Sequence, residues 1–262
     1  MHRLNPFVSA VALATLVFLY LPMLAIAILS FNRTRYGLQW NGFTTDWYTR
    51  LFQNTEILEA ARNTLVLAVV STVVATVLGT LLAIALERYP WGQRSRGWLD
   101  NLLYLPVVTP DIILAVALVV AFGALRAVSS TFEPGLLTMI LGHVTFQIAF
   151  VALTVRSRLQ SLGRDLDEAA RDLYADYGYF VRRVLLPLLT PGIVAGAMLA
   201  FTLSLDDFVI SFFTAGPTSQ TLPLLIYASV RRGVTPEIHA LSTLIFLATV
   251  LLVLASERLT RR

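Results

Sequence analysis

The sequence contains no cysteine and no lysine, and it carries few charged residues of either sign. Without cysteine the chain forms neither disulfides nor thiolate metal sites. Without lysine it has neither the lysine of a P-loop nor a Schiff-base lysine, so nucleotide hydrolysis of the P-loop type requires a separate chain. Since there are also only three histidines, we expect no metal site.

Charged residues make up 14% of the 262 residues, and apolar residues make up 56%. Soluble domains are about 25% charged, so this chain has too little polar surface for a water-soluble globule. All twenty basic residues are arginines, and they lie in short segments between apolar runs rather than in one patch. The pI of 9.7 therefore does not indicate nucleic-acid binding. The composition predicts an all-α membrane protein embedded in a lipid bilayer.

Six apolar runs are long enough to cross a bilayer core of about 30 Å as helices. They cover residues 7–31, 63–86, 102–125, 135–155, 188–213 and 240–256, and we expect them to form one transmembrane domain over residues 1–262. The first run is too long for a signal peptide, so we interpret it as a retained helix. Pro106 and Pro110 predict that the third helix is distorted.

The arginines indicate the orientation of the chain. Six spans place both termini on one side, and that side carries 13 of the arginines against 7 on the other. Because cytoplasmic loops are enriched in basic residues, both termini are predicted to be cytoplasmic. The long first loop, at about 32–62, then faces outward with Trp40, Trp47 and Tyr48. These aromatic residues form either an interfacial belt or a surface for an external partner.

A polar segment at about 157–187 separates the fourth and fifth runs. Asp165 and Asp167 suit the N-terminus of a helix, where carboxylates interact with free N–H groups and the helix dipole. Ala169 and Ala170 favour helix and have a low profile that allows close approach. The segment is either a connector on the membrane surface or a helix that docks into a groove of a cytoplasmic partner.

The residues Glu168-Ala169-Ala170, followed by Leu186-Pro187, resemble the EAA loop of permeases in ABC importers. In that family a glycine follows the glutamate by six residues, whereas this chain has Tyr174. The segments 30–32, 40–48, 110–111, 143–146, 201–209, 216–217, 221–223 and 233–238 resemble the spermidine/putrescine permeases, so the resemblance covers nearly the whole chain. It implies the type I ABC importer permease architecture, with a coupling loop that docks into an ATPase subunit through Glu168, Ala169, Ala170, Tyr174, Leu186 and Pro187.

The resemblance also implies the partners of the chain. These are a second homologous permease, two ATPase subunits that hold ATP and Mg, and a periplasmic solute-binding protein that delivers a polyamine at the inner membrane. This chain would then be a transport subunit without a cofactor, and not an enzyme. The alternatives are the same scaffold importing another small solute, or an ion-coupled secondary transporter.

Three aspartates fall within predicted spans, where a charge costs about 2.5–3.5 kcal/mol on insertion scales. Asp111, Asp206 and Asp207 either line a cation pathway or pair across a permease interface. Because adjacent helical residues point about 100° apart, we expect one of Asp206 and Asp207 to face the pathway and the other to bond within the protein. His143 is expected to form interhelical hydrogen bonds. By the resemblance, the substrate-handling positions are Trp47, Asp111, Ser204, Asp206 and Asp207.

Overall fold

The structure is a computed structural model that describes residues 6–34, 39–163 and 165–260. Arg3, Arg35, Arg164 and the terminal arginines 261–262, which contribute to the predicted orientation, lie outside the described residues. The chain divides into two compact units, residues 1–58 with 225–262 and residues 59–224. We call them the terminal unit and the central unit, and each is described by itself.

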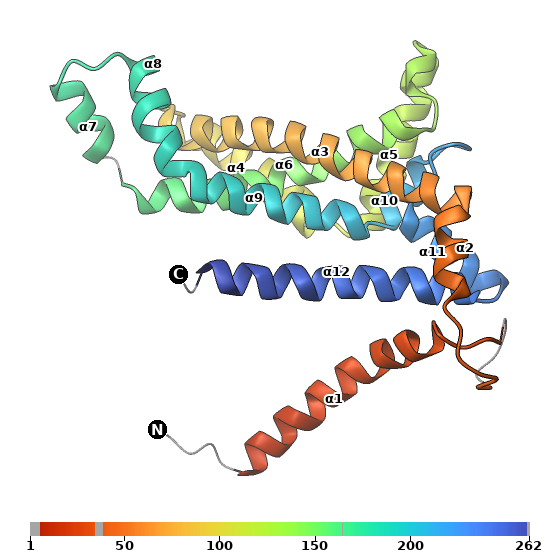
Figure 1. Cartoon of the computed structure of the whole chain (residues 1–262). Coiled ribbons are helices and arrows are strands. Elements are labelled where there is room, and N and C mark those ends of the chain that lie inside the picture. Colours follow the sequence, from red (N-terminus) through yellow and green to blue (C-terminus); the bar gives the residue numbers. More distant parts are fainter. Residues whose placement is uncertain (1–5, 35–38, 164, 261–262) are drawn as a thin grey trace. The chain divides into compact units, whose positions relative to one another are not determined.

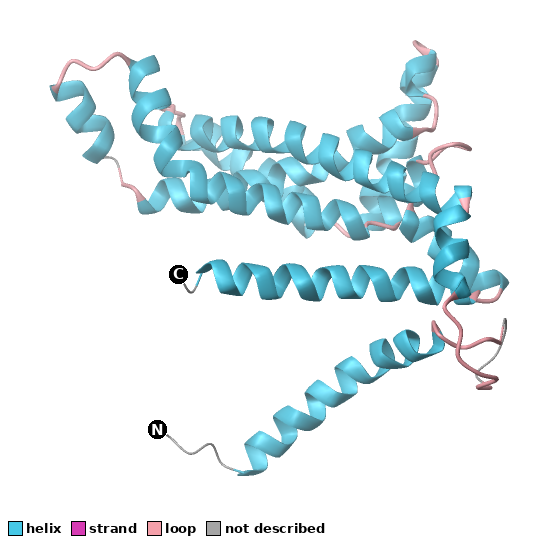
Figure 2. Ribbon diagram, in the orientation of Figure 1, coloured by secondary structure: helices cyan, strands magenta, loops and turns pink. Residues whose placement is uncertain are grey.

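Helices make up nearly all of both units, and the described part contains no extended strand (Figure 2). The helices, labelled in Figure 1, are α1 (Pro6–Leu29), α2 (Asp46–Gln53), α3 (Thr55–Arg88), α4 (Gln93–Val108), α5 (Asp111–Arg126), η1 (Ser130–Phe132), α6 (Leu136–Ser161), α7 (Asp165–Asp172), α8 (Tyr177–Phe180), η2 (Val181–Leu185), α9 (Leu186–Asp206), α10 (Val209–Thr214), α11 (Leu222–Arg232) and α12 (Pro236–Thr260). The predicted all-α class is confirmed.

Four continuous helices are long and apolar enough to cross a membrane: Phe7–Leu29, Thr55–Arg88, Leu136–Ser161 and Tyr177–Asp206. The bent pair α4 and α5 brings the number to five if it counts as one span, and Pro236–Leu251 of α12 is a shorter apolar helix. Every predicted run is therefore largely helical. The count of six spans stays a prediction.

The third predicted run, residues 102–125, is two helices and not one distorted helix. α4 and α5 meet at an angle of 107°. Pro110 lacks an N–H group and disfavours helical geometry in the residue before it. Thr109 accordingly adopts an extended conformation, with ψ at 131°. The break places Asp111 in the first turn of α5.

The fifth predicted run, residues 188–213, is also divided. α9 ends at Asp206, and Asp207 is extended with ψ at 124°. The Asp207 carboxylate accepts hydrogen bonds from the backbone N–H groups of Ile210 (3.3 Å) and Ser211 (2.8 Å) at the start of α10. An aspartate that caps a new helix in this way competes with continuation of the old one. The expectation that Asp206 and Asp207 share one helix is therefore wrong.

Glycines allow α3, α6 and α9 of the central unit to pack closely, side by side (Figure 1). A Cβ atom at Gly79 of α3 would lie 2.8 Å from the Cβ of Val151, and one at Gly196 of α9 would lie 3.3 Å from Cγ1 of the same valine. At Gly192 it would lie 2.7 Å from the Cβ of Arg158. Small residues at these contacts bring helix backbones together, which is how helices associate where no hydrophobic effect acts between them.

In the terminal unit, α12 packs against α1 and α2. The predicted outer loop at about 32–62 is partly helical, because it contains α2 and the beginning of α3. Asn54 joins α2 to α12 through a hydrogen bond from its amide to the Glu237 carboxylate (3.3 Å). Trp47 and Tyr48 therefore lie on α2, whereas Trp40 lies outside any helix.

Candidate functional site

A cavity of about 390 Å³ opens in the central unit where α5, α6, α9 and α10 approach one another. Both helix breaks border it, so the polar backbone of the breaks lies beside a cavity, as membrane proteins require. Asp111, Asp206 and Asp207, the three aspartates that the sequence placed within spans, all line this cavity. We call this cavity the acidic pocket, and it is lined by Asp111, Phe146, Phe150, Leu203, Asp206, Asp207, Phe208, Val209 and Ile210.

Asp111 and Asp206 provide the exposed charges of the acidic pocket. Both residues are exposed, and within the described residues no hydrogen bond or ion pair engages either carboxylate. Asp111 begins α5 and Asp206 ends α9, so the two carboxylates come from opposite helix ends. Two carboxylates without a cationic partner favour a bound cation, because each then exchanges water for an opposite charge.

Asp207 is bonded within the protein, as expected for one member of the pair. Nε2 of His143 lies 3.2 Å from its carboxylate and 3.1 Å from the hydroxyl of Ser211, while Nδ1 lies 2.7 Å from the hydroxyl of Ser204. The imidazole is completely buried, and it joins α6 to both α9 and α10. The prediction that His143 forms interhelical hydrogen bonds is confirmed.

Ser204 and Trp47 do not line the acidic pocket. Ser204 is buried, and its hydroxyl contacts His143 and the hydroxyl of Ser71 (3.3 Å). Trp47 belongs to α2 in the terminal unit, where its indole N–H donates to the backbone oxygen of Asn32 (2.8 Å). The Arg50 guanidinium lies 5.0 Å from the centroid of the Trp47 ring and occupies one ring face. A direct substrate role for Ser204 and Trp47 stays a prediction.

The sequence reasoning did not identify Phe146 and Phe150, which also line the acidic pocket. They lie one helical turn apart on α6 with ring centroids 6.3 Å apart, in an edge-to-face arrangement. The i, i+4 spacing places them on one face of α6 together with His143, three residues before Phe146. That shared face is the signal by which the sequence could have indicated them. Aromatic rings beside carboxylates suit an organic cation.

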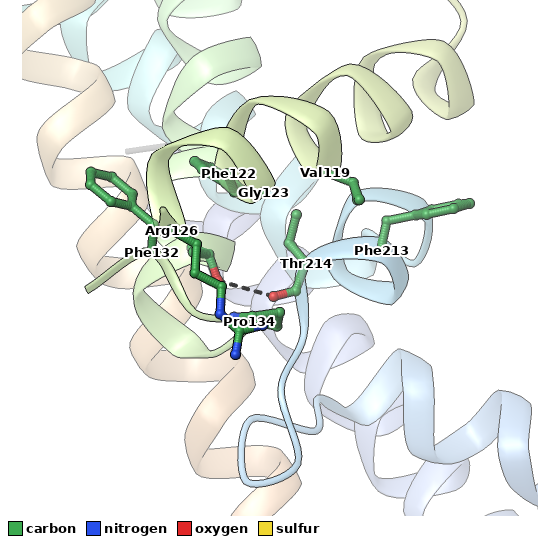
Figure 3. A pocket seen from close by; sticks show the side chains of 9 residues that line it. Val119, Phe122, Gly123, Arg126, Phe132, Pro134, Phe213 and Thr214 are labelled. Carbon is green, nitrogen blue, oxygen red and sulfur yellow. Dashed lines mark hydrogen bonds between the residues drawn. The ribbon is translucent and has the colours of Figure 1, made fainter. Parts of the chain in front are cut away.

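A second, smaller pocket of about 220 Å³ lies between α5, α6 and α10, and its charged lining residue is Arg126 (Figure 3). The hydroxyl of Thr138 donates to the backbone oxygen of Thr214 (3.1 Å) across one side of it. Phe122, Phe132 and other apolar groups cover much of the remaining wall. With a guanidinium and no carboxylate in its lining, this pocket is poorly suited to a cation.

A charged cluster ties together the helix ends that lie near the polar segment. The Arg156 guanidinium contacts the carboxylates of Glu87 and Asp100, each at 2.6 Å, and so joins α6 to α3 and α4. Arg88 of α3 contacts the Asp167 carboxylate of α7 at 2.8 Å. α7 is thereby held to the end of α3. The sequence reasoning did not identify these pairs, because their members are far apart in the chain.

The polar segment contains the expected helix, since α7 begins at Asp165 with three acidic residues in its first turn. Glu168 and Ala169 are exposed, whereas Ala170 is half-buried. Leu186 begins α9, and Pro187 lies in its first turn, directly after the π-helical turn η2. The helix is confirmed, and docking through the alanines stays a prediction.

Tyr174, at the position of the family glycine, has a left-handed backbone with φ at 54°. The N–H of Ala175 donates to the backbone oxygen of Ala170 (2.9 Å), five residues earlier. This is the hydrogen bond of a Schellman motif, in which the residue before the donor is left-handed and usually glycine. A tyrosine there costs about 1–2 kcal/mol that a glycine would not. Gly178 does not compensate, because it lies within α8 without a positive φ.

Residues 75–262 match the model of the family described as "Binding-protein-dependent transport system inner membrane component". The chain belongs to this family. It is 39% identical over 248 residues to the spermidine/putrescine transport system permease protein PotC of Escherichia coli (strain K12), covering 95% of this chain and 91% of PotC. It is also 39% identical over 242 residues to the putrescine transport system permease protein PotI of the same organism, covering 92% of this chain and 86% of PotI.

Solved structures of ABC transporters share the fold. The chain matches a bacterial transporter that imports the acidic polysaccharide alginate with a TM-score of 0.75 at 21% identity, covering 98% of this chain and 95% of that one. A match to the methionine transporter MetNI has a TM-score of 0.61 at 21% identity, covering 84% and 98%. The chain is therefore a permease subunit of the inner membrane with the type I ABC importer fold, and not an enzyme.

Proposed function

We propose that this permease moves polyamines through the acidic pocket, and that Asp111 and Asp206 contact the cationic substrate. The observation that carries the proposal is the meeting of three carboxylates with Phe146 and Phe150 in one cavity. The names of PotC and PotI, which specify spermidine and putrescine, agree with it. An anionic solute would be repelled by the same carboxylates, so a cationic cargo fits the pocket better.

The chemistry of polyamines matches this arrangement. They are flexible chains of methylene groups with ammonium groups, which require separated anionic contacts and apolar contacts between them. An ammonium 4 Å from a carboxylate gains about 4 kcal/mol at an effective dielectric constant of 20, before desolvation is counted. Each aromatic ring adds about 0.5–2 kcal/mol when it faces a cation. Asp207 is held by His143 and acts as the fixed wall of the site.

The wider assembly is also proposed. Residues 1–262 form one permease domain of six spans with both termini in the cytoplasm, and it pairs with a second homologous permease. Two ATPase subunits that bind ATP and Mg dock on the coupling segments, and a periplasmic solute-binding protein delivers the substrate. The contact between Arg88 and Asp167 supports a coupling role for α7, because it joins this helix directly to the end of α3.

Uptake of labelled spermidine and putrescine into proteoliposomes tests the proposal, with the complete transporter and an ATP supply. Asp111→Asn and Asp206→Asn should each lower uptake at least about tenfold, the equivalent of 1.4 kcal/mol per lost contact. Glu133→Gln is the matched control, because it removes a carboxylate that lies in the central unit outside the acidic pocket. Normal uptake by both aspartate variants would assign these residues a structural role instead. Absence of polyamine uptake by an assembled complex that hydrolyses ATP would indicate that the transporter carries another solute.

A further inference from the structure

His143 lies directly behind the wall of the acidic pocket. Its imidazole is completely buried on α6, and Nε2 lies 3.2 Å from the carboxylate of Asp207, which lines the pocket. The imidazole also packs against Phe146, a second lining residue, with the two ring centroids 5.6 Å apart. A change in the charge of this imidazole therefore changes the electrostatic potential of the pocket, because charges inside a protein are screened less than charges in water.

The hydrogen bonds around His143 are compatible with two protonation states. The Asp207 carboxylate accepts from two backbone N–H groups of α10, as an ionised carboxylate does, so Nε2 of His143 donates to it. Nδ1 lies 2.7 Å from the hydroxyl of Ser204, a group that both donates and accepts. A neutral imidazole accepts from this hydroxyl, whereas a charged imidazole donates to it.

A second hydroxyl behind Ser204 completes both states. The hydroxyl of Ser71 on α3 lies 3.3 Å from that of Ser204 and 3.4 Å from the backbone oxygen of Ala68. With a neutral imidazole, Ser71 donates to Ser204, which donates to Nδ1. With a charged imidazole, Nδ1 donates to Ser204, Ser204 donates to Ser71, and Ser71 donates to Ala68. Each hydroxyl keeps a partner in either state, so a proton gained by His143 requires no helix to move.

The other charged groups around His143 are few. α10 and η1 contain none, and neither do residues 63–86 of α3. Besides Asp207, α9 contributes Asp206 and α5 contributes Asp111, and both line the pocket.

The remaining charges of the surrounding helices lie farther from His143 or are already paired. Those of α4 fall within residues 94–100, beside Arg156, about 20 Å further along α6. Arg126 ends α5, where it is exposed and pairs with Glu133. Histidine is the side chain that ordinarily changes its charge between pH 5 and 8. A proton gained or lost behind the pocket wall in this range is therefore assigned to His143.

We propose that His143 adjusts the charge of the acidic pocket and thereby selects between polyamines that carry two and three ammonium groups. The inference rests on the proposed function, in which the pocket takes a polyamine. With a neutral imidazole, the three carboxylates match the three ammonium groups of spermidine. With a charged imidazole, one negative charge is offset and the pocket matches the two ammonium groups of putrescine. A positive charge behind the wall repels every ammonium group of the cargo, so it disfavours the trication more than the dication.

The test measures uptake of labelled spermidine and putrescine, supplied together at equal low concentrations, into proteoliposomes that hold the complete transporter. Amines of this kind, like that of lysine, keep their protons at about pH 5.5 and 7.5, so the charge of the cargo is constant. The ratio of spermidine to putrescine uptake should fall about tenfold from the higher pH to the lower. His143→Gln keeps a donor for Asp207 but gains no proton, so its ratio should stay within about twofold.

His239→Gln is the matched control, because it removes the other histidine that the structure describes, on α12 in the terminal unit. It should retain the pH dependence of the original chain. His143→Asn, which also gains no proton, replaces His143→Gln if that variant does not assemble. The same solute-binding protein serves all variants, so its own preference cancels in the comparison.

A ratio that stays constant with pH in the original chain would overturn the proposal without any variant. A pH dependence that persists without His143, or that disappears in His239→Gln, would also overturn it. Failure of the proposed function gives a different result, because a complex that hydrolyses ATP would then take up neither polyamine at either pH. Uptake of both polyamines at a constant ratio rejects the role of His143 alone.

Discussion

Replacement of Gly79 by alanine should destabilise the central unit, although alanine is the better helix former. The added methyl would lie 2.8 Å from Cβ of Val151 and 2.9 Å from the backbone oxygen of Ile148, closer than real Cβ atoms approach their neighbours. Val151 is fully buried and cannot withdraw, because Gly196 of α9 packs against its other side. The three helices therefore have to separate. Overpacking of this kind costs about 1–3 kcal/mol.

A cost of about 1–3 kcal/mol corresponds to a fall of roughly 2–12 °C in the melting temperature of a domain this size. Intrinsic tryptophan fluorescence in detergent measures it, since the chain has no cysteine for thiol-reactive dyes. The matched control is Gly123→Ala in α5, where no atom lies within 4 Å of the new methyl. There the higher helix propensity of alanine should leave stability unchanged or raise it by up to about 1 kcal/mol. An unchanged or higher melting temperature for Gly79→Ala would refute the packing argument.

Two further predictions concern buried polar groups. Arg156→Gln should cost roughly 2 kcal/mol, because it leaves the carboxylates of Glu87 and Asp100 without the guanidinium between them. The exposed pair of Arg126 provides the control, and Arg126→Gln should cost at most about 1 kcal/mol in the same thermal unfolding experiment. His143→Leu should lower the free energy of unfolding by about 1–3 kcal/mol in a denaturant titration, because it removes the buried imidazole that contacts Ser204, Ser211 and Asp207, and His143→Gln should lose less. Similar stability for Arg156→Gln and Arg126→Gln, or for His143→Leu and the unmodified chain, would contradict the respective prediction.

The long helices were predictable from the sequence because span formation depends mostly on local composition. The runs at 7–31, 63–86 and 135–155 coincide with α1, α3 and α6 to within a few residues at most ends. The distortion near Pro110 was also predictable, because a proline disfavours helical backbone geometry in the residue before it in any context. The bend of 107° was not predictable, because its size depends on how α5 packs against α10.

The break at Asp207 shows the limit of this reasoning. No proline or glycine lies in residues 206–209, so the segment reads as continuous helix. The chain breaks there because the carboxylate of Asp207 caps α10 and contacts His143, a residue more than sixty positions earlier. The aspartates were recognised as unusual from the cost of charge in a membrane. Their division into Asp206, which faces the pocket, and Asp207, which is bonded, depended on tertiary contacts.

The carboxylates of the acidic pocket lie at the two helix breaks of the central unit. α6 and α9 are locked together by the close contacts at Gly192 and Gly196, so sliding between them would require the glycine contacts to part. The helix Tyr177–Asp206 is continuous over 30 residues. At a rise of about 1.5 Å per residue it extends roughly 45 Å, from the polar segment to the acidic pocket. In the proposed function, movement of the polar segment therefore reaches the pocket as movement of α6 and α9 together. The break before Asp111 lies at the start of α5, and the break at Asp207 lies between α9 and α10. In the proposed function, rotation at the break before Asp111 changes the separation of the Asp111 and Asp206 carboxylates without disrupting a hydrogen bond within α5 or α9, which is the change that a site needs in order to bind a cation and then release it.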